Sequence, residues 1–148
     1  MIATMGRNVH AVVEGRLRVI GQRYTSKREK LVSIFQRATK PLSIGEILEA
    51  GRGLPQSSIY RNLSVLEHAG VVRRVITEEE FARFELAEEF TVHHHHLICS
   101  QCGKVKDIEI PGALESNLDR TIDRLAKKTG FAEVRHRLDL FGICGNCA

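Results

Sequence analysis

Two Cys-x-x-Cys pairs constrain the fold of this 148-residue chain more than any other feature. They are Cys99 with Cys102 and Cys144 with Cys147, and the sequence has no other cysteine. Four thiolates from two such pairs can form the tetrahedral shell that Zn²⁺ prefers in a closed structural site. Since 41 residues separate the pairs, one ion would join the start of the C-terminal half to its end. That half is too small to be held together comfortably by burial alone.

The alternatives for these cysteines are two disulfides or a redox Cys-x-x-Cys motif. The first ten residues lack the apolar block of a secretory signal, so we expect a cytoplasmic protein, and that setting disfavours disulfides. No run reaches ~18 apolar residues, so we expect no membrane span. Because redox motifs usually come singly, the sequence predicts a structural zinc.

A run of four histidines, His93 to His96, ends three residues before Cys99. If this segment is extended, His93 and His95 point to one face and His94 and His96 to the other. Each pair can then serve a separate metal site, because imidazole with carboxylate suits Zn²⁺, Fe²⁺, Mn²⁺ or Ni²⁺. The candidate oxygen donors are Glu85, Asp107 and Glu115. The alternative is a solvated polar run.

The charge is divided unevenly between the two halves of the chain. Residues 1–76 have 13 Lys and Arg against 5 Asp and Glu, a net charge of +8, whereas residues 77–148 have 9 against 13, a net charge of −4. A basic first half suits a polyanion and an acidic second half suits cations. The alternative is ordinary surface scatter.

The first half reads as helices followed by a hairpin. Capping boxes at Ser26–Glu29 and Ser43–Glu46 predict the starts of two helices, and Pro55 predicts the start of a third. An earlier helix is expected over roughly 9–20. After Gly70, β-rich residues 71–76 and alternating residues 81–86 flank a charged turn at 78–80. Helices followed by such a hairpin predict a winged helix-turn-helix.

The third helix is the DNA-binding candidate. Its polar residues face away from the apolar stripe or flank its start, and such side chains reach bases and phosphates from the major groove. They are Gln56, Ser57, Ser58, Tyr60, Arg61 and Asn62. Arg23, Lys27 and Arg28 are further candidates for phosphate or minor-groove contacts. The alternative is an ordinary polar surface.

The second half predicts a small α+β unit. Strands are expected over 94–98 and 105–110, a helix from Pro111 to Gly130, and a long strand over roughly 131–141. His136 lies on the apolar face of that last strand, where a lone histidine is more often a hydrogen-bonded core residue than a ligand. The expected domains are 1–87 and 93–148, joined by a hinge over 88–92.

Taken together, these residues resemble the ferric uptake regulator (Fur) family from about residue 14 to the C-terminus. The segments that carry the resemblance are Gly21-Gln22-Arg23-Tyr24-Thr25-Ser26-Lys27-Arg28, Ser58-Ile59-Tyr60-Arg61-Asn62-Leu63, Leu66-Glu67-His68-Ala69-Gly70, Phe84-Glu85-Leu86, His93 to His96, Cys99-x-x-Cys102-Gly103-Lys104 and Gly142-Ile143-Cys144-x-x-Cys147. The combination is specific, although each piece alone is not.

The resemblance implies a homodimeric transcriptional repressor that binds AT-rich palindromic DNA when Fe²⁺, or another divalent metal such as Zn²⁺ or Mn²⁺, is bound. It implies a winged-helix domain followed by an α/β dimerisation domain with structural zinc. By position, it assigns the four cysteines to that zinc, Glu85, His94, His96 and Asp107 to a sensory site, and His93, His95, Glu115 and His136 to an additional site. Tyr60 and Arg61 match DNA-contacting positions and Arg23 a minor-groove contact.

The chain departs from the family pattern at several positions. Many members have a sensory His just before a Pro, where this chain has Lys40, which cannot ligate while charged. No cysteine remains for a thiolate sensor, and the peroxide-sensing branch usually has Asp at the position of Glu85. The sequence therefore favours Fe²⁺-dependent control of metal-uptake genes, with zinc, manganese or peroxide sensing as alternatives.

The sequence gives weaker support to two other classes of function, a zinc-dependent hydrolase and a metal-storage protein. A zinc-dependent hydrolase needs an open metal position and a general base, and no His-Glu-x-x-His motif is present. A metal-storage protein would leave the basic first half without a role. We therefore expect no enzymatic activity.

Overall fold

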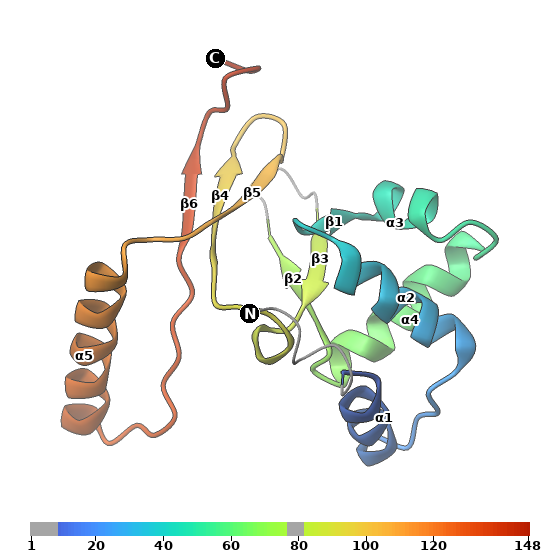
Figure 1. The fold of residues 1–148 in the computed structure, drawn as a ribbon, viewed down its shortest axis with the longest axis horizontal. Coiled ribbons are helices and arrows are strands. Elements are labelled where there is room, and N and C mark those ends of the chain that lie inside the picture. Colours follow the sequence, from blue (N-terminus) through green and yellow to red (C-terminus); the bar gives the residue numbers. More distant parts are fainter. Residues whose placement is uncertain (1–8, 77–81) are drawn as a thin grey trace. The chain divides into compact units, whose positions relative to one another are not determined.

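The computed structural model describes residues 9–76 and 82–148, which form two compact units. The first unit ends at His93, and the second runs from His94 to Ala148 (Figure 1). Among the described residues, no helix is both long and apolar enough to cross a membrane.

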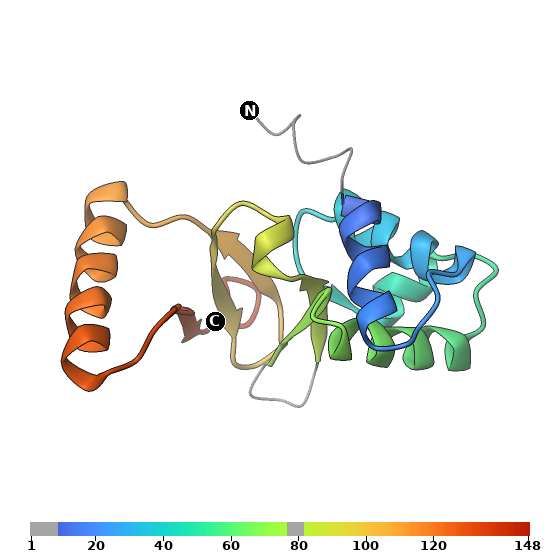
Figure 2. The same cartoon turned by 90° about the horizontal axis from the view of Figure 1, so that it is seen from below.

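The first unit is a set of helices with a small antiparallel sheet (Figures 1 and 2). Its elements are α1 (Val9–Val19), α2 (Ser26–Arg37), β1 (Leu42–Ser43), α3 (Ile44–Ala50), α4 (Gln56–His68), β2 (Val72–Val75), β3 (Arg83–Leu86) and the 3₁₀ helix η1 (Glu88–Phe90). The strand order is β1-β3-β2. This is the predicted winged helix, with β1 as a short third strand that the sequence did not indicate. The predicted turn at 78–80 lies outside the described residues.

The helix starts were predicted with mixed success. Ser43 caps α3 as expected, since its side chain accepts from the backbone N–H of Glu46 while the Glu46 carboxylate accepts from the backbone N–H of Ser43. The box at Ser26–Glu29 was wrong by one residue. Thr25 is the N-cap of α2, and its side chain accepts from the backbone N–H of Arg28. Both Ser and Thr are good caps, so spacing alone could not choose between them.

The described residues of the first unit form an apolar core. The predicted helical stripes supply most of it, because residues three and four apart share a helix face. Its buried members are Val9, Val13, Leu17, Leu31, Val32, Ile34, Phe35, Ile47, Ile59, Leu63, Leu66, Val71, Val72, Phe84 and Leu86. The hairpin residues Val72, Phe84 and Leu86 join the helices here, so the core fixes α4 against the wing.

Arg28 connects α2 to α4 from inside this unit. Its side chain is buried and donates to the Asn62 side chain at 2.9 Å, to the Gln22 side chain at 3.0 Å and to the backbone carbonyl of Arg23 at 2.5 Å. The expectation that Arg28 contacts DNA is therefore corrected, because its guanidinium is used within the fold. Asn62 is likewise buried rather than on the outer face of α4.

The second unit has three strands and one long helix. Its elements are β4 (His95–Cys99), β5 (Val105–Ile108), α5 (Gly112–Thr129) and β6 (Asp139–Gly142). The sheet order is β5-β4-β6, with β5 antiparallel and β6 parallel to β4. The long strand predicted over 131–141 was wrong for residues 131–138. Pairing with β4 begins only at Asp139, and Glu133 has a positive φ of 53°, which interrupts an extended chain.

The helix α5 is amphipathic but has no buried residue. Leu114 and Leu125 of its apolar stripe are 55% and 56% exposed, and Phe141 and Ile143 near the end of the chain are 48% and 57% exposed. Only Ile98, Cys99 and Val105 are buried hydrophobic residues among those described in this unit. Burial within one chain therefore contributes little to its stability.

The capping residue Glu46 also joins two basic side chains. Its carboxylate lies 2.7 Å from the Lys40 ammonium and 3.0 Å from the Arg83 guanidinium. Burial alone would raise the pKa of Glu46, but hydrogen bonds from Lys40 and from the backbone of Ser43 lower it to about 2.

We expect Glu46→Gln to lower the free energy of unfolding at pH 7 by ~1 kcal/mol. Because the pKa of Glu46 falls from its ordinary value of 4.5 to about 2 on folding, its contribution is complete above pH 4.5. The contribution decreases as the pH falls below 4.5 and is lost as the pH falls through about 2. Urea unfolding of both proteins between pH 7 and pH 2 measures this. Glu49→Gln, at an exposed position of α3, is the control. A difference as large at pH 2 as at pH 7 would contradict the assignment.

Candidate metal centres

The four cysteines meet at one end of the second sheet. Cys99 ends β4, and its register partner in the parallel strand β6 is Gly142, two residues before Cys144. A tight turn returns Cys102 to the same place, with Gly103 at φ 68° and its N–H donating to the carbonyl of Cys99. The four Sγ atoms lie within 4.8 Å of one another. Two chain segments 41 residues apart thus supply one tetrad of sulfur donors, which fits Zn²⁺.

The thiols in this tetrad titrate differently. The backbone N–H of Cys144 donates to Sγ of Cys99 at 3.4 Å and, with the backbone N–H of Cys102, lowers the pKa of Cys99 to about 6. Hydrogen bonds with the side chains of Cys144 and Cys102 raise the pKa of Cys147 to about 12. Four thiolates this close need a cation, so metal binding would release protons.

The histidine run alternates across β4 as predicted. His94 and His96 point to one side, with their ring centroids 5.1 Å apart, while His95 stacks on His136 on the other side at 5.4 Å. His95 and His96 are both 2% exposed. Since adjacent residues of one strand face opposite ways, the run supplies two separate clusters.

The first cluster contains His94, His96 and Asp107. Asp107 on β5 is the cross-strand partner of His96. Its two carboxylate oxygens lie 3.9 Å from Nε2 of His94 and 3.8 Å from Nε2 of His96. The Nε2 atoms and the carboxylate therefore converge on one point, and this nitrogen and oxygen donor set fits Fe²⁺, Zn²⁺ or Mn²⁺.

Asp139 orients His96 from the other neighbouring strand. It is the β6 register partner of His96, and its Oδ1 lies 2.9 Å from Nδ1 of His96. A carboxylate on one ring nitrogen fixes the other nitrogen for a metal. Asp139 was not among the predicted site residues, because its role depends on the pairing of β6 with β4.

The second cluster contains His95, Glu115 and His136. The Glu115 carboxylate, in the first turn of α5, lies 2.9 Å from Nε2 of His95 and 2.8 Å from Nε2 of His136. Asp119, one helical turn further along, lies 3.6 Å from Nδ1 of His136. His136 is thus placed among potential metal ligands, and not as a lone histidine in an apolar core.

The two remaining predicted ligands belong to the first unit. Glu85 on β3 is buried and accepts from Nε of Arg73 at 2.6 Å. His93 contacts the Glu88 carboxylate through Nδ1. Lys40 is paired with Glu46, as described above, so its ammonium is held by a carboxylate.

The helix α4 presents part of its predicted DNA-binding set to solvent. Ser57, Tyr60 and Arg61 are exposed, and Ser58 is half-buried. Arg23 and Lys27, before and within the start of α2, are also exposed. These side chains are accessible to a nucleic acid, in contrast to Arg28 and Asn62.

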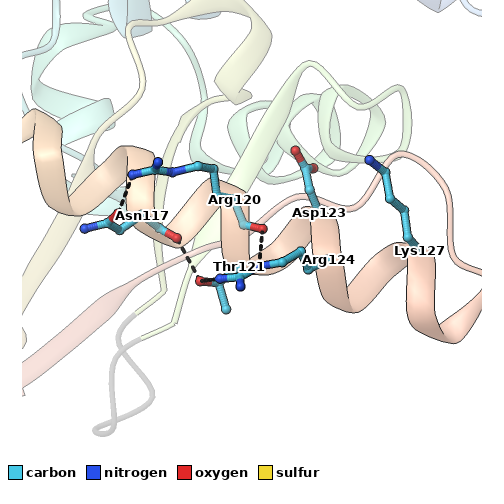
Figure 3. Close-up of a pocket in the computed structure, with 6 residues that line it drawn as sticks. All are labelled: Asn117, Arg120, Thr121, Asp123, Arg124 and Lys127. Carbon is cyan, nitrogen blue, oxygen red and sulfur yellow. Dashed lines mark hydrogen bonds between the residues drawn. The ribbon is translucent and has the colours of Figure 1, made fainter.

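A hollow on α5 has a different character (Figure 3). Its polar side chains bond along their own helix: Arg120 donates to the Asn117 side chain at 2.5 Å, and the Thr121 hydroxyl donates to the Asn117 carbonyl at 2.8 Å. Neither histidine nor cysteine lines it. We do not count this hollow among the metal centres.

We expect Cys99→Ser to yield protein without the zinc that the native chain retains, because three thiolates no longer close the site. The second unit should then unfold, since little buried surface supports it. Elemental analysis and circular dichroism check this, with Ser100→Ala as the matched control. A zinc-free Cys99→Ser protein with native helix content would contradict it.

Comparison with known proteins places the chain in a family. The model of the ferric uptake regulator family matches residues 19–141. The peroxide operon regulator of Bacillus subtilis is 29% identical over 136 residues, covering 89% of this chain and 88% of that protein. The ferric uptake regulation protein of Campylobacter jejuni is 31% identical over 137 residues, covering 88% and 83%.

The same fold is found in solved structures. That of the Helicobacter pylori ferric uptake regulator, described as having three functional metal-binding sites, has a TM-score of 0.72 and 25% identity, and the match covers 99% of this chain and 95% of that one. The winged helix and the zinc-compatible second unit agree with this match. The chain belongs to the ferric uptake regulator family.

Proposed function

We propose that this protein is a transcriptional repressor that uses Fe²⁺ as corepressor to control metal-uptake genes. The observation that carries the proposal is the convergence of His94, His96 and Asp107 directly after the winged-helix unit. A nitrogen and oxygen cluster beside a separate thiolate tetrad suits a responsive metal beside a permanent one. Such a repressor acts on DNA, which implies a cytoplasmic location.

The DNA-binding surface in this proposal is the exposed face of α4 with the residues before α2. Tyr60, Arg61 and the Ser57–Ser58 pair would meet base edges and phosphates, while Arg23 would reach the minor groove. The net charge of +8 over residues 1–76 supports a polyanionic partner. We propose AT-rich palindromic operators, because a symmetric dimer presents two such helices.

The sensory site in this proposal adds Glu85 to His94, His96 and Asp107. Glu85 is carried by the winged-helix unit and the other three by the second unit. A divalent cation bound by ligands from both units would link the two units. That link would favour one arrangement of the recognition helices. The free energy of ligation would thereby select the DNA-binding conformer. Lys40, paired with Glu46, contributes no ligand.

The other two sites would stabilise the second unit. We assign the thiolate tetrad to structural zinc, and His93, His95, Glu115 and His136 to an additional site. Since Glu115 lies on α5 and His136 precedes β6, an ion held there would attach the helix to the sheet.

The uncovered apolar residues of the second unit support a homodimer. Leu114 and Leu125 of α5 and the side chains of Phe141 and Ile143 are exposed in the single chain. Exposed large apolar side chains in such number favour an interface when they gather in a patch. We propose that a second copy of the chain covers it.

Relatives named for iron and for peroxide match the chain about equally well. Zinc-, manganese- or peroxide-responsive repression is therefore the second candidate. Neither a hydrolase nor a storage protein agrees with relatives that are regulators.

We expect Fe²⁺ to raise the affinity of the zinc-containing protein for operator DNA by about 100-fold, within the usual range of allosteric coupling. Asp107→Asn should abolish this increase because it removes a ligand charge, whereas Glu109→Gln, at an exposed position two residues later, should retain it. Gel retardation with Fe²⁺, Mn²⁺, Zn²⁺ and Ni²⁺ in turn identifies the corepressor. Equal affinity with and without every metal would refute the proposal.

We also expect Arg61→Ala to weaken operator binding by ~10-fold without changing metal affinity, because Arg61 is exposed on α4 and remote from the ligands in sequence. The buried Arg28 provides the contrast: Arg28→Lys should lower the unfolding temperature, since Asn62 and Gln22 lose a donor. Fluorescence anisotropy and thermal unfolding separate the two effects. An Arg61→Ala protein with native operator affinity would exclude α4 as the recognition helix.

A further inference from the structure

Glu85 has a cationic partner in its own hairpin. Arg73 is its directly opposed residue in the β2–β3 pair, so both side chains lie on the same face of the sheet. Nε of Arg73 donates to Oε1 of Glu85 at 2.6 Å. The side chains are only 17% and 9% exposed, so solvent screens this charge-assisted hydrogen bond weakly.

Arg73 also faces a second carboxylate. Its Nη1 lies 4.0 Å from Oε2 of Glu88 in η1. A guanidinium has five N–H donors in a fixed plane, so it can remain partnered by Glu88 while its bond to Glu85 changes. Glu88 in turn contacts His93.

A guanidinium and a divalent cation compete for one carboxylate. Both are attracted to its negative charge, and they repel each other at the distances of direct contact. Resting on the proposed function, in which Glu85 is a metal ligand, we propose that Arg73 is the counter-ion that Glu85 exchanges for the metal. Arg73 thereby sets the metal concentration at which the sensory site fills.

The exchange leaves no buried charge without a partner. In the metal-free protein, Arg73 neutralises Glu85, and in the loaded protein Glu88 retains Arg73. The metal affinity of the site therefore reflects a difference in free energy between two states. In one, Arg73 pairs with Glu85; in the other, Glu85 binds the metal and Arg73 pairs with Glu88. An uncompensated buried guanidinium would oppose metal binding far more strongly.

The test compares Arg73→Gln with Arg74→Gln in full-length protein that carries its structural zinc. Arg74 is the next residue of the same strand, on the opposite face, and pairs with Glu67 at 3.3 Å in an exposed position. Chelator-buffered Zn²⁺ is the probe. The ring signals of His94 and His96 in NMR spectra report filling of the sensory site, and that of His136 reports the other cluster.

We expect the sensory site of Arg73→Gln to fill at a free Zn²⁺ concentration about tenfold lower than that required by the native protein. This difference corresponds to the loss of one competing hydrogen bond. Arg74→Gln should fill at the native concentration. Unchanged or weakened filling in Arg73→Gln would overturn the inference, since Arg73 would then be neutral or would position Glu85 for the metal.

A measurement on the native protein covers the case in which Arg73→Gln does not fold. The Nε–H signal of Arg73 should be protected from exchange with water in the metal-free state, and it should shift as the His94 and His96 signals change with Zn²⁺. The Nε–H signal of Arg74 should not follow them. An Arg73 signal that stays constant throughout filling would overturn the inference.

Glu85→Gln separates this inference from the proposed function. If Glu85→Gln weakens filling and Arg73→Gln does not strengthen it, only the role of Arg73 fails. If Glu85→Gln leaves filling unchanged, Glu85 is not a ligand, and the proposed sensory set and this inference both fail.

Discussion

The second unit depends on its thiolate tetrad, because little apolar surface is buried within the single chain to hold its sheet and helix together. Its long helix has no buried residue, and only three of its described hydrophobic residues are buried. A zinc ion at Cys99 and its three partners would close β4 onto the segment after β6, at the end of the sheet. The positions of the histidine ligands on β4 depend on that sheet, so the metal-responsive chemistry rests on the structural site.

The histidine run places its side chains on the two faces of the sheet that contains β4. His96 has a carboxylate from each neighbouring strand, Asp107 near Nε2 and Asp139 at Nδ1. His95, on the other face, meets Glu115 and His136. The alternation of a strand is enough to create two clusters that share no ligand, so one can fill while the other is unoccupied. In the proposed repressor, a sensory ion held by nitrogen and oxygen donors could be exchanged while the thiolate tetrad keeps its own ion.

Much of this arrangement could be predicted from the sequence. Local sequence patterns were enough for the helices, the hairpin and the alternation of the histidines. The spacing of Ser43 and Glu46 was enough for the capping box. What failed depended on partners distant in sequence. Residues 131–138 alternate like a strand, but pairing with β4 begins only at Asp139. Arg28 was expected to contact DNA, but its side chain donates a hydrogen bond to Asn62, 34 residues away in the sequence. The Arg73–Glu85 pair could not be predicted without the register of the hairpin, which places the two residues opposite each other.

The central claim is a division of donors, with sulfur for the structural ion and nitrogen and oxygen for the responsive one. X-ray absorption at the zinc and iron edges of protein loaded with both metals tests it most directly, because each edge reports one element. We expect zinc surrounded by four sulfur atoms at about 2.3 Å and iron surrounded by nitrogen and oxygen atoms alone. Sulfur in the iron shell, or imidazole nitrogen in the shell of the structural zinc, would contradict it.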